Sequence, residues 1–418
     1  MMYRMRVLFL LLPAILLPHV LKSQEWPRFR GENGNGVGKI SSLPVRITKA
    51  DYEWAIKLNG VGHSSPVLWG ERLFLTLFDP EAGTRKVLCF DSSKGSSLWE
   101  KEFPVQEHNL HKHNNLASST PVATAEALFV VWGDGDKTEA LALDHDGKIL
   151  WERDWPKFSS DHGFGASPIF VDGVLVLHTD SVAEKESQIL GLNPSTGETI
   201  WKVNRVTAGA DEKHLTAYNT PTTVTIDGQK MIVVLQTNDG WKGLAPQTGE
   251  VMWEYDGEYK LRSVGSITSG NGVLFATFGS GGSGKVATAL LPKSSGAPSV
   301  LYELGIADGL SYVPTPLLYE DRLYLWADGG ILTCRNATSG EEIYRERIGG
   351  NFFSSPIIAD GKILCCSRDG ELVAVGLGDQ FEVLGRSRLS SGMNATPAVA
   401  NNRLFLRTDT HLISIRGQ

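Results

Sequence analysis

The chain has 418 residues and a net charge of −7, and 41% of its residues are hydrophobic, which is enough for a sizeable core. Its 45 glycines and 19 prolines favour many turns and short elements over long helices. No run of Lys or Arg follows the first residues, which argues against nucleic acid or an anionic membrane surface as a partner, because both need a clustered basic face.

The N-terminus has the pattern of an export signal. Arg4 and Arg6 precede the apolar stretch VLFLLLPAILLPHVL (residues 7–21), which is too short and too often interrupted by proline to span a membrane. We therefore expect residues 1–24 to be a signal peptide and residues 25–418 to form a single domain with no transmembrane segment. The expected location is periplasmic or extracellular.

One short phrase recurs along the chain and opens an apolar run. It is a Ser-Pro or Thr-Pro pair, as in SSPVLWGERLFLT and ASPIFVDGVLVLH. Seven copies begin at Ser64, Ser119, Ala166, Asn219, Pro314, Ser354 and Ala395. GSITSGNGVLFAT, from Gly265, fits the same frame without the proline, so eight copies follow one another at spacings of 40 to 55 residues.

A second phrase lies downstream and ends in an aromatic residue. In five copies a Gly stands four residues before that aromatic residue, as in NPSTGETIW and PQTGEVMW. The aromatic residues are Trp99, Trp151, Trp201, Trp253 and Tyr344, and a degenerate sixth copy ends at Tyr302. We interpret each ring as a wedge that packs against a neighbouring repeat, with the Gly providing the turn that aims it.

Each copy is interpreted as four strands. The proline opens the first strand, where its missing N–H is tolerated, and pairs such as Asp172-Gly173 predict tight hairpins into the second. The eighth copy has room for only three strands, so we expect YEWAIKL (residues 52–58), which carries Trp54, to supply the fourth and close the ring. The predicted fold is an all-β, eight-bladed β-propeller of four-stranded antiparallel blades.

The two phrases together resemble the pyrroloquinoline-quinone-like (PQQ-like) β-propeller repeat, over about residues 26–416. This repeat is found in quinoprotein alcohol dehydrogenases and in the propeller subunit of the outer-membrane barrel assembly machinery, and many of its members bind no quinone. The segment EWPRFRGENGNGVG (residues 25–38) is similar to the N-terminal entry of exported bacterial proteins of this class. We interpret this segment as an edge-covering one.

For the dehydrogenases, the resemblance implies PQQ with Ca²⁺ held by carboxylate and amide ligands, an Asp as base and a vicinal disulfide over the quinone. The only adjacent cysteines are Cys365 and Cys366, which fall inside a predicted strand, and no Glu, Asn and Asp match the ligand positions. Cys89 and Cys334 occupy matching strand positions and are interpreted as small core residues. We therefore assign no resident cofactor from the sequence, and PQQ with Ca²⁺ is the alternative.

The connections between blades hold most of the polar side chains of interest. In a propeller these loops emerge on one face and dip toward the central channel, so we expect a ligand funnel there. Its predicted residues are His63, Asn115, His162, Tyr218, Asn219, Arg262, Tyr312, Phe352 and Asn394. Imidazole, amide and guanidinium groups suit a polar or anionic ligand, or a metal. The alternative is that these loops are simply a solvated surface or a protein interface.

Two other patterns carry less information. Six histidines lie in these connections, namely His63, His108, His111, His113, His162 and His214, and of these His63, His111 and His162 are weak candidates for a metal site. GSGGSGKV (residues 279–286) has the spacing of a phosphate-binding loop, but Val286 replaces the Ser or Thr that would reach the metal. A strand rather than a helix follows, so we predict a hairpin loop.

Two hypotheses of different class follow. The first is an exported, non-enzymatic propeller that binds a protein partner or a polar ligand on its inter-blade loop face, because every repeated feature is architectural. The second is a PQQ-dependent oxidoreductase acting on alcohols or sugars, which rests on the blade number and on Cys365-Cys366. Fold alone does not decide between them.

Overall fold

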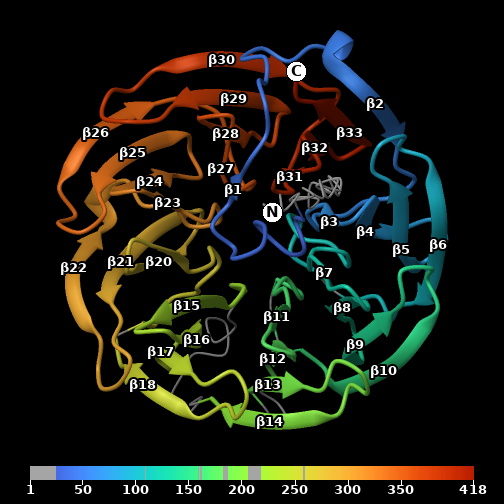
Figure 1. Ribbon diagram of the computed structural model, residues 1–418, viewed down its shortest axis with the longest axis horizontal. Coiled ribbons are helices and arrows are strands. Elements are labelled where there is room, and N and C mark those ends of the chain that lie inside the picture. Colours follow the sequence, from blue (N-terminus) through green and yellow to red (C-terminus); the bar gives the residue numbers. More distant parts are fainter. Residues whose placement is uncertain are drawn as a thin grey trace, which may run out of the picture.

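The computed structural model describes residues 25–108, 110–158, 160, 162–181, 187–205, 218–257 and 259–418. The expected signal peptide (residues 1–24) and His214 lie outside the described residues. Eight sheets are arranged around a central axis as the blades of a propeller (Figure 1). The predicted fold class is confirmed.

The first four blades have four strands each, running from the axis outward. Blade 1 holds β3 (Val67–Trp69), β4 (Arg72–Asp79), β5 (Thr84–Asp91) and β6 (Ser97–Pro104). Blade 2 holds β7 (Val122–Ala123), β8 (Leu128–Gly133), β9 (Lys137–Leu143) and β10 (Ile149–Pro156). Blade 3 holds β11 (Ile169–Val171), β12 (Val174–Thr179), β13 (Gln188–Leu192) and β14 (Thr199–Asn204). Blade 4 holds β15 (Thr222–Ile226), β16 (Gln229–Gln236), β17 (Gly240–Leu244) and β18 (Val251–Tyr255).

The last four blades follow the same order, with additions from the N-terminal part of the chain. Blade 5 holds β19 (Thr268–Gly270), β20 (Val273–Ser280), β21 (Ser283–Leu291) and β22 (Ser299–Gly305). Blade 6 holds β23 (Leu317–Tyr319), β24 (Arg322–Trp326), β25 (Ile331–Asn336) and β26 (Glu342–Arg347). Blade 7 holds β27 (Ile357–Ala359), β28 (Lys362–Cys366), β29 (Glu371–Gly376) and β30 (Val383–Arg388), and β1 (Val37–Gly38) joins it in parallel to β27. Blade 8 holds β31 (Ala398–Ala400), β32 (Arg403–Arg407), β33 (His411–Arg416) and β2 (Tyr52–Lys57).

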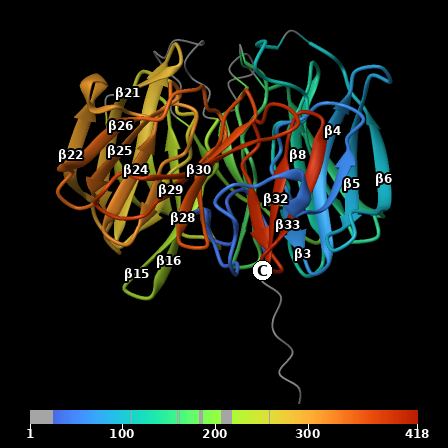
Figure 2. The same ribbon diagram turned by 90° about the horizontal axis from the view of Figure 1, so that it is seen from above.

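The helical content of the described residues is limited to two single turns of 3₁₀ helix, η1 (Lys49–Asp51) and η2 (Ile306–Asp308). None of their helices is long and apolar enough to cross a membrane. Seen edge-on, the ring is a thick disc, and the C-terminus and the hairpin between β15 and β16 lie at the same face (Figure 2).

Strand position within a blade explains the sequence pattern. The second strand is packed by neighbouring blades on both faces, so it is a continuous buried run, as in LFVVWG of β8. The outermost strand is mostly exposed, as in SLWEKEFP of β6. The first hairpins are tight: Asp172 and Gly173 both have positive φ (47° and 82°), which a two-residue turn of the type I′ class requires.

The N-terminal strand closes the ring. β2 pairs antiparallel with β33, with Trp54 opposite Ser414. Glu53 on β2 receives two hydrogen bonds from the Arg403 guanidinium on β32, at 2.6 and 3.0 Å. Strands from the two ends of the chain therefore complete one blade, as the sequence predicts.

Aromatic wedges join successive blades along most of the ring. The Trp201 Nε1 donates to the Pro246 carbonyl oxygen at 2.9 Å, and its ring covers Gly249 of blade 4. Equivalent hydrogen bonds run from Trp54, Trp99, Trp151 and Tyr302 to the carbonyl oxygens of Ser92, His145, Pro194 and Ala337.

One predicted wedge residue makes its hydrogen bond within its own blade, and another reaches the next blade through a ring contact. Trp253 donates to the Met231 sulfur within its own blade at 3.3 Å. A Cβ added at Gly296, the corresponding glycine of blade 5, would have no atom within 4 Å. Tyr344 packs against Phe381 of blade 7, with ring centroids 5.8 Å apart.

Residues 25–38 cross the central channel. Trp26 pairs with Leu68 of blade 1, and the Pro27 carbonyl oxygen accepts from the Ala123 N–H of blade 2. Farther along, Arg30 donates to the Pro316 carbonyl oxygen of blade 6 at 2.8 Å. Besides covering the inner edge of blade 7 through β1, the segment thus ties blades together from inside the ring (Figure 1).

Candidate functional site

A cavity of about 610 Å³ lies where the inter-blade connections converge on the ring axis. All eight connections contribute to it through two of the three residues that precede the proline of each copy, or Ile267 in blade 5. In every copy the first of the three is half-buried and the next two are buried. The third residue before the proline therefore faces the cavity.

Eight residues occupy this facing position. They are His63, Ser118, Gly165, Tyr218, Val264, Val313, Phe353 and Asn394, and all eight line the cavity. Their chemistry differs from blade to blade, which makes the wall asymmetric although the backbone frame is repeated.

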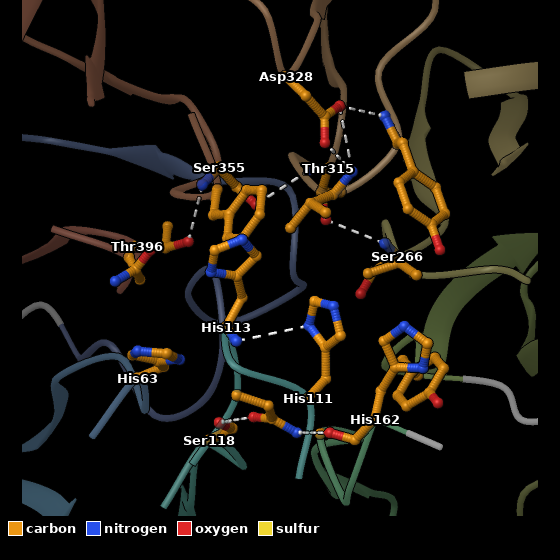
Figure 3. Close-up of a pocket in the computed structure, with 18 of the residues that line it drawn as sticks. His63, His111, His113, Ser118, His162, Ser266, Thr315, Asp328, Ser355 and Thr396 are labelled. Atoms are coloured by element: carbon orange, nitrogen blue, oxygen red, sulfur yellow. Dashed lines mark hydrogen bonds between the residues drawn. The ribbon is translucent and has the colours of Figure 1, made fainter. Parts of the chain in front are cut away.

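A ring of hydroxyls lies directly beneath them. The residue before each proline, or before Ile267, is Ser or Thr: Ser65, Thr120, Ser167, Thr220, Ser266, Thr315, Ser355 and Thr396. In seven links of 2.9–3.1 Å, the backbone N–H of one member donates to the side-chain oxygen of the next, and the link from Thr396 to Ser65 joins the last copy to the first. Figure 3 shows the part of this ring from Ser266 to Thr396. Each of the seven accepting hydroxyls both satisfies a buried N–H and fixes the start of a strand.

Six of the nine predicted funnel residues line the cavity: His63, His162, Tyr218, Arg262, Tyr312 and Asn394. The other three do not. Asn219 is buried and donates to the Leu235 carbonyl oxygen, and Phe352 is buried against Trp326. The Asn115 side chain accepts from the Ala117 N–H within its own loop.

The loop between β6 and β7 brings two more histidines into the cavity. The Asn114 side chain receives a hydrogen bond from Ser118 and donates to the His162 carbonyl oxygen at 2.6 Å, which anchors this loop beside blade 3. His111 then stacks on His162, with ring centroids 4.7 Å apart, and His113 lies beside His111 (Figure 3). His108 is not among the lining residues.

Two guanidiniums are held at the wall by these rings. The backbone of Arg262 is fixed because its carbonyl oxygen accepts from the Gly279 N–H. The Arg262 Nη1 lies 3.0 Å from the His162 Nε2. Arg368, from the turn after β28, lies 2.9 Å from the His113 Nδ1 and 4.4 Å above the Phe353 ring.

The cavity contains one carboxylate among its lining residues. Asp328, from the turn after β24, accepts from the Tyr312 and Val313 N–H groups at 2.7 and 3.2 Å. Burial raises its pKa to about 6, although those hydrogen bonds favour the charged form. On the opposite wall, burial and the charges of Arg407 and Arg368 lower the pKa of His63 to about 3, so this imidazole is neutral at pH 7.

The residues present do not fit a calcium–quinone centre of the kind the resemblance implies. Cys365 and Cys366 are free thiols in β28 and are buried in two different core clusters, not above the cavity. In the described part of the chain, no three His, Cys, Asp or Glu side chains are grouped so that they could hold a metal ion. Asp328 is the single lining carboxylate among those residues.

Fold and cavity together define the class of the protein: a four-stranded, eight-bladed propeller with a polar axial cavity on its inter-blade loop face. The sequence profile of the family described as outer membrane protein assembly factor BamB matches residues 47–224, 181–297 and 300–379. The chain belongs to this family of PQQ-like propellers, which confirms the resemblance seen in its repeats.

Solved structures show the same architecture. The chain is similar to BamB from Moraxella catarrhalis, with 15% identity and a TM-score of 0.61, over 90% of this chain and 98% of that one. It is similar to quinohemoprotein alcohol dehydrogenase from Comamonas testosteroni (13% identity, TM-score 0.64, 94% and 81% covered). It is also similar to the computationally designed Ika8 protein (13% identity, TM-score 0.59, 86% and 98% covered). At such identities the likeness shows the fold alone. None of the curated proteins is similar enough to count as a relative.

Proposed function

We propose that this protein is an exported, non-enzymatic binding propeller that holds a polar ligand, or a polar group of a protein partner, in its axial cavity. The observation that supports this proposal is the convergence of side chains from all eight connections on one cavity of about 610 Å³. That volume is in the range of small-molecule sites, roughly 300–1,000 Å³.

The local chemistry favours binding over catalysis. The contacts between lining groups are Arg–His contacts, stacked rings and hydroxyls that accept from backbone N–H groups, which are devices for recognition. Likeness to BamB supports a protein partner only by analogy, since the same architecture is shared with a dehydrogenase and with a designed protein.

The test fills the cavity without changing charge. Val313 lines the cavity and Val300 is exposed on β22, so Val313→Trp is the blocking variant and Val300→Trp its control. Native mass spectrometry is run against a fixed panel of small polar molecules and short peptides. Ligands that bind the wild type and V300W but not V313W support the proposal. The proposal is contradicted if V313W binds these ligands as well as the wild type does, or if no molecule in the panel binds the wild type.

The alternative, a PQQ-dependent oxidoreductase, has its own test. Addition of PQQ with Ca²⁺ would raise the melting temperature and give dye-linked oxidation of alcohols or sugars. With no carboxylate–amide cluster among the described lining residues, we expect neither effect. Export is tested separately by asking whether residues 1–24 direct a reporter out of the cytoplasm.

A further inference from the structure

Four arginines surround the axial cavity, and none of them takes part in an ion pair within the described residues. Arg262 and Arg368 line the wall, and Arg28 and Arg30 lie in the segment that crosses the channel below. Other arginines of the ring pair with acids at short range, for example Arg403 with Glu53 at 2.6 Å. The four cavity arginines have no such acidic partner among the described residues, in a chain whose net charge is −7.

The two wall arginines are held by aromatic and imidazole rings. Arg262 contacts His162, and Arg368 contacts His113 and the Phe353 ring. The buried Nε of each has no hydrogen-bond partner in the described part of the chain. These contacts orient the guanidiniums without neutralising them, so charge and donors remain for a ligand.

The floor of the cavity is also positive. Phe29 lines the cavity between Arg28 and Arg30, which donate to the Pro221 and Pro316 carbonyl oxygens at 3.2 and 2.8 Å. Burial lowers the pKa of Arg28 to about 10 and that of Arg30 to about 9, so both are still charged at pH 7. Carbonyl dipoles stabilise these charges but supply no countercharge.

Negative charge near the cavity is already engaged. Asp328 accepts from two backbone N–H groups, and the exposed Asp409, which interacts electrostatically with Arg368 and Arg407, accepts from Asn394. Lys112 adds another cation to the lining. Buried charge without a counterion is costly, so this excess is best explained by an anion that binds between the arginines.

We propose, building on the proposed function, that the ligand is a small molecule bearing an oxyanion, a carboxylate or a phosphate, held between Arg262 and Arg368 above the floor formed by residues 28–30. The guanidinium fork donates two parallel hydrogen bonds to either group. The hydroxyl ring and Phe353 supply neutral contacts to the rest of the ligand.

The experiment uses calorimetric titration of the full chain with citrate and with inorganic phosphate, which separates the two sources of the oxyanion. Arg262→Gln and Arg368→Gln remove one cavity charge each. Arg416→Gln is the matched control, because Arg416 is on β33 with 67% of its side chain exposed. Melting temperatures are recorded for all variants.

We expect the wild type to bind citrate, phosphate or both, and R416Q to bind the same anion with the same affinity. Each cavity variant should bind that anion at least about tenfold more weakly than the wild type. Binding should also weaken as salt is raised. If a cavity variant does not fold, the salt dependence of the wild type and its loss of binding in V313W carry the test. Absence of binding to both anions, or unchanged binding by R262Q and R368Q, overturns the inference.

The result is separable from the proposed function. A neutral molecule that binds the wild type and is blocked in V313W, together with no binding of citrate or phosphate, would overturn the oxyanion while leaving the proposed function intact. If the wild type bound no molecule of the panel and neither anion, both the oxyanion inference and the proposed function would be overturned.

Discussion

Trp201 of blade 3 lies against Gly249 of blade 4 so closely that a Cβ on Gly249 would be 2.5 Å from its ring. The indole N–H completes the contact through the Pro246 carbonyl oxygen. The turn that holds the Thr-Gly phrase of one blade therefore packs against the aromatic residue of the preceding blade.

This contact predicts a difference between two glycines at equivalent turns. Gly249 and Gly296 have nearly the same φ, 68° and 72°, but the space beside Gly296 is empty. Gly296→Ala should cost only the left-handed backbone strain, about 1 kcal/mol. Gly249→Ala should cost about 1–3 kcal/mol more, because the indole must move. Urea unfolding measures both, and equal losses would show that the wedge contact is unimportant.

The hydroxyl ring predicts a second pair. Thr315→Val removes the acceptor of the buried Ser266 N–H and should destabilise the fold by about 1–3 kcal/mol. Thr333→Val is the control, since the buried Thr333 hydroxyl has no partner among the described residues and its removal should be neutral or stabilising. Thermal melts compare them, and a neutral Thr315→Val would argue against the ring as a stabilising element.

Ring closure predicts a measurable coupling between Glu53 and Arg403. A double-mutant cycle with Glu53→Gln and Arg403→Gln should give roughly 1–2 kcal/mol, since the pair is bidentate and mostly buried. The same cycle on Arg72 and Asp146, an exposed pair between blades 1 and 2, should give no measurable coupling. Similar values for the two cycles would contradict this expectation.

His178 predicts a dependence of stability on pH. Burial, with a smaller effect of Arg205, lowers its pKa to about 3, whereas the unfolded side chain keeps its usual value of 6.5. Between these values the unfolded chain binds a proton that the folded chain does not, so stability falls as pH decreases below 6.5. His178→Leu should reduce the loss between pH 7 and pH 5 by about 2 kcal/mol. Parallel pH profiles for variant and wild type would exclude this role.

The fold was predictable because its determinants are local. The spacing of glycine and aromatic residues, the proline at each strand start and the Asp-Gly turns are all readable within one repeat. Closure through Trp54 followed by counting strands, since one blade lacked its fourth. The hydrogen bond of Trp253 within its own blade was not predictable, because its partner Met231 lies outside the repeated phrase.

The site was predicted in part, for a physical reason. Asn219 and Phe352 are each one residue away from the facing position, which is occupied by Tyr218 and Phe353. Choosing the third residue before the proline in every copy would have given Tyr218 and Phe353 in their place. Arg368 could not be predicted from the inter-blade connections, because it comes from a hairpin between the second and third strands of its blade, which lies on the same face as the connections.

The strand that closes the ring is made long before the strand it pairs with. Glu53 and Arg403 are separated by 350 positions, so β2 must wait, unpaired, for most of the chain to be synthesised after it. Joining such distant ends carries a large loop-closure entropy and slows folding. A chain cut short before its final strands would therefore leave β2 as an orphan edge, open to pairing with another molecule.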